Sequence, residues 1–421
     1  MIEPKRWTTT LRLTAFAACA AAVMATAGCA ADAGSGRSTG SADTSPTSQA
    51  ASAADPALAG RLDTAIEGAM TAAAVPGAVV GIWGTQGDYV RAFGVADKAT
   101  GAPMEADFYH RIGSVTKTFT VTGVLRLADE GKVGLDDPVA KFVDGVPNGE
   151  VITLRQLARM QSGLFNYSAD ESFERALLDD PDRAFTPREL LDFAFAHPPG
   201  FPPGEGFEYS NTNTILLGLV VEKVSGMRLH DYLTDHITTP SGLSHTTFPT
   251  DGALPQPHAQ GYSHGADDTE IVATDWNPSW AWAAGAMIST LDDMRTWAPA
   301  LATGKLLTPA MQAQRLETVA APGLPPQDGY GMGVFDLGGW IGHNGSLPGY
   351  QTVVAYLPER ETTLVIMLNT DVGVQGSEPS TILATAITKE LTPDHVYTLD
   401  ANVQAPEVSP APAAPTTTPT R

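Results

Sequence analysis

The sequence predicts an α+β fold in which an antiparallel sheet is built from both ends of the chain and flanked by helices. Two strand-like segments stand near the start of the folded region, and three or more return after residue 328. The stretch between them has mainly helical periodicity and helix-capping residues. We expect this mainly helical insert to form a second lobe, with a cleft between the lobes.

The predicted elements are marked by their hydrophobic period and by turn residues. An amphipathic helix over 57–73 precedes strands over 77–83 and 89–95, which a Gly-rich turn joins as a hairpin. Caps and closing glycines predict the helices of the insert: a capping box at Thr153 whose helix ends at Gly163, a helix with Thr186 before Pro187, a helix over 213–224 closed by Gly226, and a helix opened by Ser289. Later strands are predicted over 330–337, 351–357 and 362–369, before a final helix over 380–391.

Composition and charge restrict the class of protein. The 421 residues carry 47 acidic and 25 basic side chains, for a formal net charge of -22. Such a surface repels phosphate backbones, so we expect no nucleic-acid partner. Mutual repulsion of copies favours a monomer.

The two ends of the chain are predicted to lie outside the folded domain. Residues 1–28 have a basic start and a short apolar run, and they read as a signal peptide. Cys29 follows small residues, as in the bacterial lipoprotein signal, which predicts lipidation of Cys29 and an anchor on the outer face of the cytoplasmic membrane; the alternative is an ordinary signal peptide and secretion. We expect a disordered tether over 29–56, a hydrolase domain over 57–400 and a Pro/Ala/Thr-rich disordered tail over 401–421.

Ser114 and Lys117 form the first candidate chemical motif, Ser-x-x-Lys. The apolar spacing after Ser114 is helical, so both side chains lie on one face at a helix N-terminus. There the helix dipole favours negative charge near the Ser114 hydroxyl, and a desolvated Lys117 can act as its base. The alternative is a helix-capping Ser with an exposed Lys.

Two further segments carry polar residues suited to a cleft. Tyr209 and Asn211 follow a Gly/Pro-rich loop, where a Tyr can transfer a proton and an Asn can bind a carbonyl; the alternative is a turn whose Asn caps the next helix. The third segment holds His343, Gly345 and Ser346 on or beside a late strand, and its alternative is an ordinary strand-end turn.

Together the three segments resemble the serine β-lactamase and D-alanyl-D-alanine carboxypeptidase superfamily, in its carboxypeptidase and esterase branch. The resemblance covers roughly residues 60–391. It implies that Ser114 becomes acylated while Lys117 and Tyr209 share the acid and base roles. It further implies that Asn211, His343 and Gly345 bind substrate, and that the backbone N–H groups of Ser114 and Ser346 form an oxyanion hole.

The pattern departs from peptide-trimming members in one respect. Residues 316–359 contain no Lys or Arg to hold a substrate carboxylate. We therefore expect a serine hydrolase acting on an ester, an amide or a D-amino acid peptide of the cell envelope. The alternatives are a D-alanyl-D-alanine carboxypeptidase or β-lactamase, and a non-catalytic envelope lipoprotein that binds a ligand or partner. No metal ligand set or cofactor motif is found, so the expected partner is a small-molecule or peptide substrate, possibly derived from the cell wall.

Overall fold

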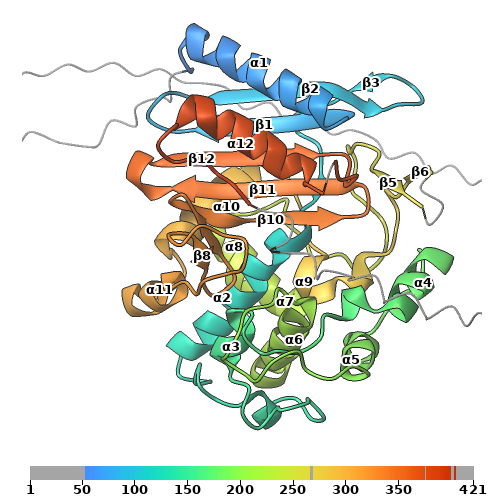
Figure 1. Ribbon diagram of the computed structural model, residues 1–421, viewed down its shortest axis with the longest axis vertical. Coiled ribbons are helices and arrows are strands. Elements are labelled where there is room, and N and C mark those ends of the chain that lie inside the picture. The colour runs from blue at the N-terminus through green and yellow to red at the C-terminus, as the bar shows by residue number, and fades with distance from the viewer. Residues whose placement is uncertain (1–52, 266–268, 375, 400–402, 404–421) are drawn as a thin grey trace, which may run out of the picture. The chain divides into compact units, whose positions relative to one another are not determined.

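The computed structural model describes residues 53–265, 269–374 and 376–399, together with Val403. In this part of the chain the main sheet is antiparallel and has eight strands in the order β3-β2-β1-β12-β11-β10-β9-β8 (Figure 1). Its strands are β1 (Gly77–Trp83), β2 (Tyr89–Asp97), β3 (Ala102–Pro103), β8 (Gly329–Tyr330), β9 (Phe335–Leu337), β10 (Trp340–Leu347), β11 (Tyr350–Leu357) and β12 (Thr362–Leu368). Both ends of the chain thus build one sheet, which confirms the predicted fold class.

Two helices cover one face of this sheet. They are α1 (Pro56–Ala72) and α12 (Pro379–Leu391), which pack against each other across the strands (Figure 1). Leu62 of α1, Leu383 of α12 and Ile366 of β12 are buried in one hydrophobic cluster there. Burial of such side chains contributes about 1.5–3 kcal/mol each and fixes the helices on the sheet.

The second hydrophobic cluster joins the other face of the sheet to the helical insert. Val365 of β12, Met294 of α10 and Phe119 of α2 belong to it, so the two layers share one core. The helices of the insert are α2 (Thr116–Asp129), α3 (Leu154–Ala158), α4 (Glu171–Asp179), α5 (Pro187–Phe195), α6 (Asn211–Ser225), α7 (Leu229–Leu233), α8 (Thr239–Ser241), α9 (Trp282–Gly285), α10 (Leu291–Thr303) and α11 (Pro309–Leu316). Two small ribbons pair β4 (His110–Arg111) with β7 (Ile288–Ser289) and β5 (Tyr262–His264) with β6 (Glu270–Val272).

The predicted start signals of the helices are mostly confirmed. Thr153 and Thr186 each form a complete capping box, and Gly226 closes α6 in the left-handed conformation with φ +70°. The cap of α10 is Thr290 rather than the predicted Ser289, because Ser289 belongs to β7 and its hydroxyl contacts Thr246 at 2.8 Å.

Two other sequence-based boundaries were wrong. The helix that starts after Thr153 ends at Ala158 instead of reaching Gly163. Gly163 is required for another reason, since a Cβ there would lie 2.1 Å from the carbonyl oxygen of Phe201. The single strand predicted over 330–337 is a hairpin of β8 and β9, in which the N–H of Gly331 donates to the carbonyl of Val334 at 2.8 Å.

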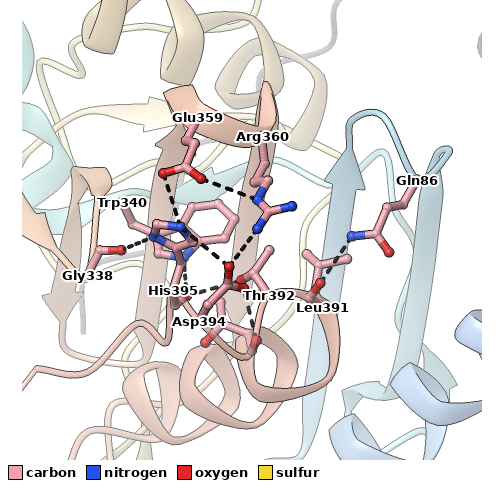
Figure 2. A network of polar contacts seen from close by, with 10 residues as sticks. Gln86, Gly338, Trp340, Glu359, Arg360, Leu391, Thr392, Asp394 and His395 are labelled. Carbon is pink, nitrogen blue, oxygen red and sulfur yellow. Dashed lines mark hydrogen bonds and ion pairs between the residues drawn. The ribbon is translucent and has the colours of Figure 1, made fainter.

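Polar contacts bind the segment after α12 to the turns at one end of strands β10, β11 and β12 (Figure 2). The indole N–H of Trp340 donates to the carbonyl of His395 at 2.8 Å, and the His395 ring donates to the carbonyl of Gly338 at 2.8 Å. Arg360 forms an ion pair with Asp394 at 2.6 Å. These bonds tie the segment that follows α12 to the start of β10, the strand that carries the third sequence motif.

Candidate active site

Ser114 lies where the helical insert meets the sheet. It is the middle residue of a short 3₁₀ turn (Gly113–Val115) that leads directly into α2 and packs against β10. Its side chain keeps partial exposure, whereas the residues around it are buried. The turn therefore presents one hydroxyl group at the N-terminus of a 14-residue helix, where the dipole favours negative charge.

Two glycines allow the Ser114 turn to touch the sheet. A Cβ on Gly345 would lie 2.1 Å from the carbonyl oxygen of Ile112 and 2.8 Å from the backbone nitrogen of Ser114. A Cβ on Gly113 would lie 2.6 Å from the backbone nitrogen of Ser346. The backbone nitrogens of Ser114 and Ser346 are the pair predicted to form the oxyanion hole. Both lie at this close contact between the Ser114 turn and β10. Gly345 serves this approach of the Ser114 turn to the strand.

Lys117 is completely buried directly beneath Ser114. Its Nζ lies 2.9 Å from Ser114 Oγ, 2.7 Å from Asn211 Oδ1 and 2.9 Å from the carbonyl oxygen of Ala284. No carboxylate forms an ion pair with Lys117 among the described residues. Burial therefore lowers the pKa of the Lys117 amine well below its usual value.

The three contacts of Lys117 suit a neutral amine. Asn211 Oδ1 and the Ala284 carbonyl can only accept, so they take the two N–H groups of a neutral Nζ. In that neutral form the lone pair of Nζ is left for the Ser114 hydroxyl, 2.9 Å away, which can then donate to it. A neutral Lys117 can therefore accept the proton of the Ser114 hydroxyl directly.

Tyr209 stands on the other side of the Lys117 amine. Its ring centroid lies 4.9 Å from Lys117 Nζ, and its buried hydroxyl has no hydrogen-bond partner among the described residues. Burial raises the pKa of Tyr209 well above its usual value, and the nearby Ser114 hydroxyl acts in the opposite direction. Tyr209 is thus a neutral, protonated donor at physiological pH, within reach of the Ser114 region.

His343 is fully buried on β10 and uncharged. The Tyr330 hydroxyl donates to its Nε2 at 3.2 Å, while its Nδ1 donates to the carbonyl of Asn344 at 2.5 Å. Burial, with the nearby Lys117, lowers the pKa of His343 to about 3. His343 is therefore neutral at pH 7, and its proposed contact with substrate stays a prediction.

The comparison with known proteins identifies the family to which this constellation belongs. The beta-lactamase family model matches residues 62–387. The chain belongs to the beta-lactamase family. Members of this family are serine hydrolases, and they include amidases and penicillin-binding proteins.

Solved structures of beta-lactamase relatives share the fold over nearly their whole length. A D-stereospecific amidohydrolase from Streptomyces sp. superimposes with a TM-score of 0.71 at 32% identity, over 80% of this chain and 99% of that one. The D-amino acid amidase from Ochrobactrum anthropi SV3, complexed with D-phenylalanine, gives a TM-score of 0.69 at 27% identity, over 79% and 99% of the two chains.

Curated relatives include longer proteins. Protein flp of Staphylococcus aureus (strain MW2) is 27% identical over 73% of this chain and 62% of its own length. The putative penicillin-binding protein PbpX of Bacillus subtilis (strain 168) is 27% identical over 66% of each chain. This chain thus spans about two thirds or less of the length of these proteins.

The structure adds two residues to this beta-lactamase-type site that the sequence patterns did not single out. Ser168 Oγ accepts from Asn211 Nδ2 at 3.0 Å and donates to Asn166 Oδ1 at 3.1 Å. Asn166 Oδ1 also accepts from the backbone N–H of Asn211 at 3.0 Å. These bonds orient the Asn211 amide so that its oxygen faces Lys117. In the sequence, both residues follow shortly after Gly163, where the helix that starts after Thr153 was predicted to end.

The described residues bring Ser114, Lys117, Tyr209, Asn211, His343, Gly345 and Ser346 together in one place. Cys29, the predicted lipidation site, lies outside them. In the described ranges no group of three or more His, Cys, Asp or Glu side chains is placed to hold a metal ion.

Proposed function

We propose that the protein is an acyl-serine amidohydrolase that cleaves small D-amino acid derivatives, with Ser114 as its nucleophile. The observation that carries this proposal is the buried Lys117 amine, whose Nζ lies 2.9 Å from Ser114 Oγ and within 2.9 Å of the carbonyl oxygens of Asn211 and Ala284. The substrate class is supported by the two structural relatives that are named a D-stereospecific amidohydrolase and a D-amino acid amidase.

The first half of the proposed reaction forms an acyl-enzyme. Lys117 Nζ takes the proton of the Ser114 hydroxyl as Oγ attacks the carbonyl carbon of the substrate. The oxyanion that forms is stabilised by the backbone N–H groups of Ser114 and Ser346. Tyr209 then gives its proton to the leaving nitrogen, the C–N bond breaks, and Lys117 returns a proton to Tyr209.

The second half releases the acid. A water molecule attacks the ester carbonyl of the acylated Ser114 while Tyr209 and Lys117 take its proton. The Ser114 Oγ–carbon bond breaks, Oγ regains a proton, and the carboxylic acid leaves. Asn211, held by Ser168, binds the acyl group of the substrate through its amide. His343, through Tyr330, fixes the adjacent stretch of β10.

The segment around the third motif offers no free basic side chain to bind a carboxylate, which supports an uncharged leaving group. Residues 316–359 hold no Lys or Arg, and the adjacent Arg315 is fully buried, where its Nη2 donates to the carbonyl of Thr118 at 3.1 Å. The alternative, a D-alanyl-D-alanine carboxypeptidase or β-lactamase, is favoured by the names of relatives such as PbpX, and it requires a cation for the substrate carboxylate.

The test compares hydrolysis of D-phenylalanine amide with that of its L-enantiomer, and separately follows acylation by a penicillin using intact mass. We expect D-selective hydrolysis that is lost in Ser114→Ala. Stable or rapid acylation by penicillin, with cleavage of a D-alanyl-D-alanine peptide, would instead support the carboxypeptidase or β-lactamase function. Absence of any hydrolysis and any acylation would support the ligand-binding lipoprotein.

We also propose that Cys29 is lipidated after cleavage at Gly28 and anchors the enzyme to the outer face of the cytoplasmic membrane. The Ala-Gly-Cys sequence supports this proposal. No helix of the described segments is long and apolar enough to cross a bilayer. Metabolic labelling with palmitate should mark the protein, and Cys29→Ala should lose the label. Equal labelling of both forms, or none, would favour an ordinary signal peptide.

A further inference from the structure

An acidic side chain lies against the strand that carries the third motif. Glu378 precedes α12 without capping it, and its Oε2 accepts from Asn344 Nδ2 at 2.8 Å. Asn344 is fully buried on β10 between His343 and Gly345. No Lys, Arg or His of the described segments forms an ion pair with Glu378.

A second set of contacts ties this end of α12 to Ser346. The backbone N–H of Ser380 donates to Gln351 Oε1 at 2.9 Å, and Gln351 Nε2 lies 3.5 Å from Ser346 Oγ. Gln351 and Ser346 are paired across β10 and β11. Since alternate residues of a strand share a face, the side chains of Asn344 and Ser346 point to the same side. The Glu378 carboxylate therefore lies beside the end of β10 that forms the proposed oxyanion hole.

The charge of Glu378 also reaches the proposed proton donor. Its carboxylate contributes to raising the pKa of Tyr209, whose hydroxyl serves the leaving group. Burial raises the pKa of Glu378, the hydrogen bond from Asn344 lowers it, and Asp371, in the loop after β12, raises it further. Two acidic side chains thus lie at this end of β10, Glu378 on Asn344 and Asp371 on the backbone N–H of Gly349.

We infer that Glu378 is a specificity determinant that rejects substrates whose leaving group carries a carboxylate. The inference rests on the proposed function and narrows its substrate class to amides and esters whose leaving group is neutral or cationic. A carboxylate within several ångströms of Glu378 would be repelled in a site that is partly closed to water. Peptides that end in a free D-amino acid, and penicillins, fall in the rejected class.

The experiment uses two dipeptides that share one acyl group and differ only in leaving-group charge: D-phenylalanyl-glycine and D-phenylalanyl-glycinamide. For the wild-type protein, we expect kcat/KM to favour the glycinamide by at least about 10-fold. Glu378→Gln keeps an acceptor for Asn344 and should reduce this preference about 5-fold or more, through a faster reaction of the free acid. Glu390→Gln, on the same helix but in a surface ion pair with Arg61 at 3.2 Å, is the matched control and should leave the preference unchanged.

An unchanged preference in a folded Glu378→Gln variant would overturn the inference. A second readout needs no variant: raising ionic strength should narrow the wild-type preference, and a preference insensitive to salt would contradict a charge-based selection. If the wild-type protein cleaves neither dipeptide and also fails to cleave D-phenylalanine amide, the proposed function is wrong. In that case each dipeptide is tested for protecting Ser114 from a fluorophosphonate, and equal protection by both would overturn the role of Glu378 separately.

Discussion

The amine of Lys117 lies 2.9 Å from the Ser114 hydroxyl oxygen, one turn further along the same helix. Its other two contacts are acceptors that cannot donate to it. This geometry gives the serine a base without a histidine or a carboxylate in contact with it. Asn211 and the carbonyl of Ala284 hold the Lys117 amine in this position.

Replacing Lys117 should nearly abolish acylation. We expect Lys117→Ala to lower the rate at which Ser114 reacts by about 10³-fold or more, because the base is lost and water does not replace it at that depth. The rate is measured with a fluorophosphonate under single-turnover conditions. Lys132→Ala, which removes an exposed lysine after α2, is the control and should react at the wild-type rate. Comparable rates in the two variants would remove Lys117 from the mechanism.

Activity should be lost toward acid pH through protonation of Lys117. Because burial lowers the pKa of Lys117, the neutral form should persist to a lower pH than for an ordinary lysine and disappear as the pH falls through that lowered value. His343, with a pKa of about 3, should add no ionisation between pH 5 and 8. A profile of kcat/KM against pH should therefore show one acid limb. A rate that rises up to about pH 10.4, the ordinary pKa of lysine, would contradict a neutral Lys117.

A methyl group on Gly345 should displace the nucleophile. Gly345→Ala places a Cβ against Ile112 and the backbone nitrogen of Ser114, so we expect kcat/KM to fall about 100-fold, as it does when an oxyanion-hole donor is lost. Gly60→Ala, inside α1 with no atom beyond its own helix turn within 4 Å of the new Cβ, should instead stabilise the protein by about 0.5–1 kcal/mol without changing kcat/KM. Wild-type kinetics in Gly345→Ala would show that the close contact is not needed.

Removing the hydroxyl of Ser168 should weaken substrate binding more than chemistry. Ser168→Ala leaves the Asn211 amide without one of its partners, a loss of about 1 kcal/mol. We expect KM to rise about 5-fold with kcat changed less than about 2-fold. Steady-state kinetics measure both constants, and Ser244→Ala, at an exposed position, is the control. A fall in kcat at constant KM would mean that Ser168 acts on the reacting atoms.

The elements that could be predicted from the sequence are those whose signals lie in neighbouring residues. The hairpin of β1 and β2, the capping boxes at Thr153 and Thr186, and the helix that follows Ser114 were all predicted from nearby residues. The three motifs predicted one site, and the structure places their side chains in contact. Prediction from neighbouring residues failed at Gly163, because this glycine is required by its close approach to the carbonyl oxygen of Phe201 and not by the end of a helix.

The residues missed by the sequence act across large separations. Ser168 reaches Asn211 over 43 positions, and Glu378 reaches Asn344 over 34 positions. Neither has a spacing that marks it, because a loop or a helix start can bring any polar residue to the site. Tyr330 was read as part of a strand, and its bond to His343 depends on the hairpin that replaced that strand.

The most direct test of the central claim is the intact mass of the purified protein after reaction with a fluorophosphonate, alongside Ser114→Ala. The account predicts one added label per chain, located on the peptide that contains Ser114, and none on the variant. A label that persists in Ser114→Ala, or that maps to another residue, would contradict the assignment of Ser114 as the nucleophile.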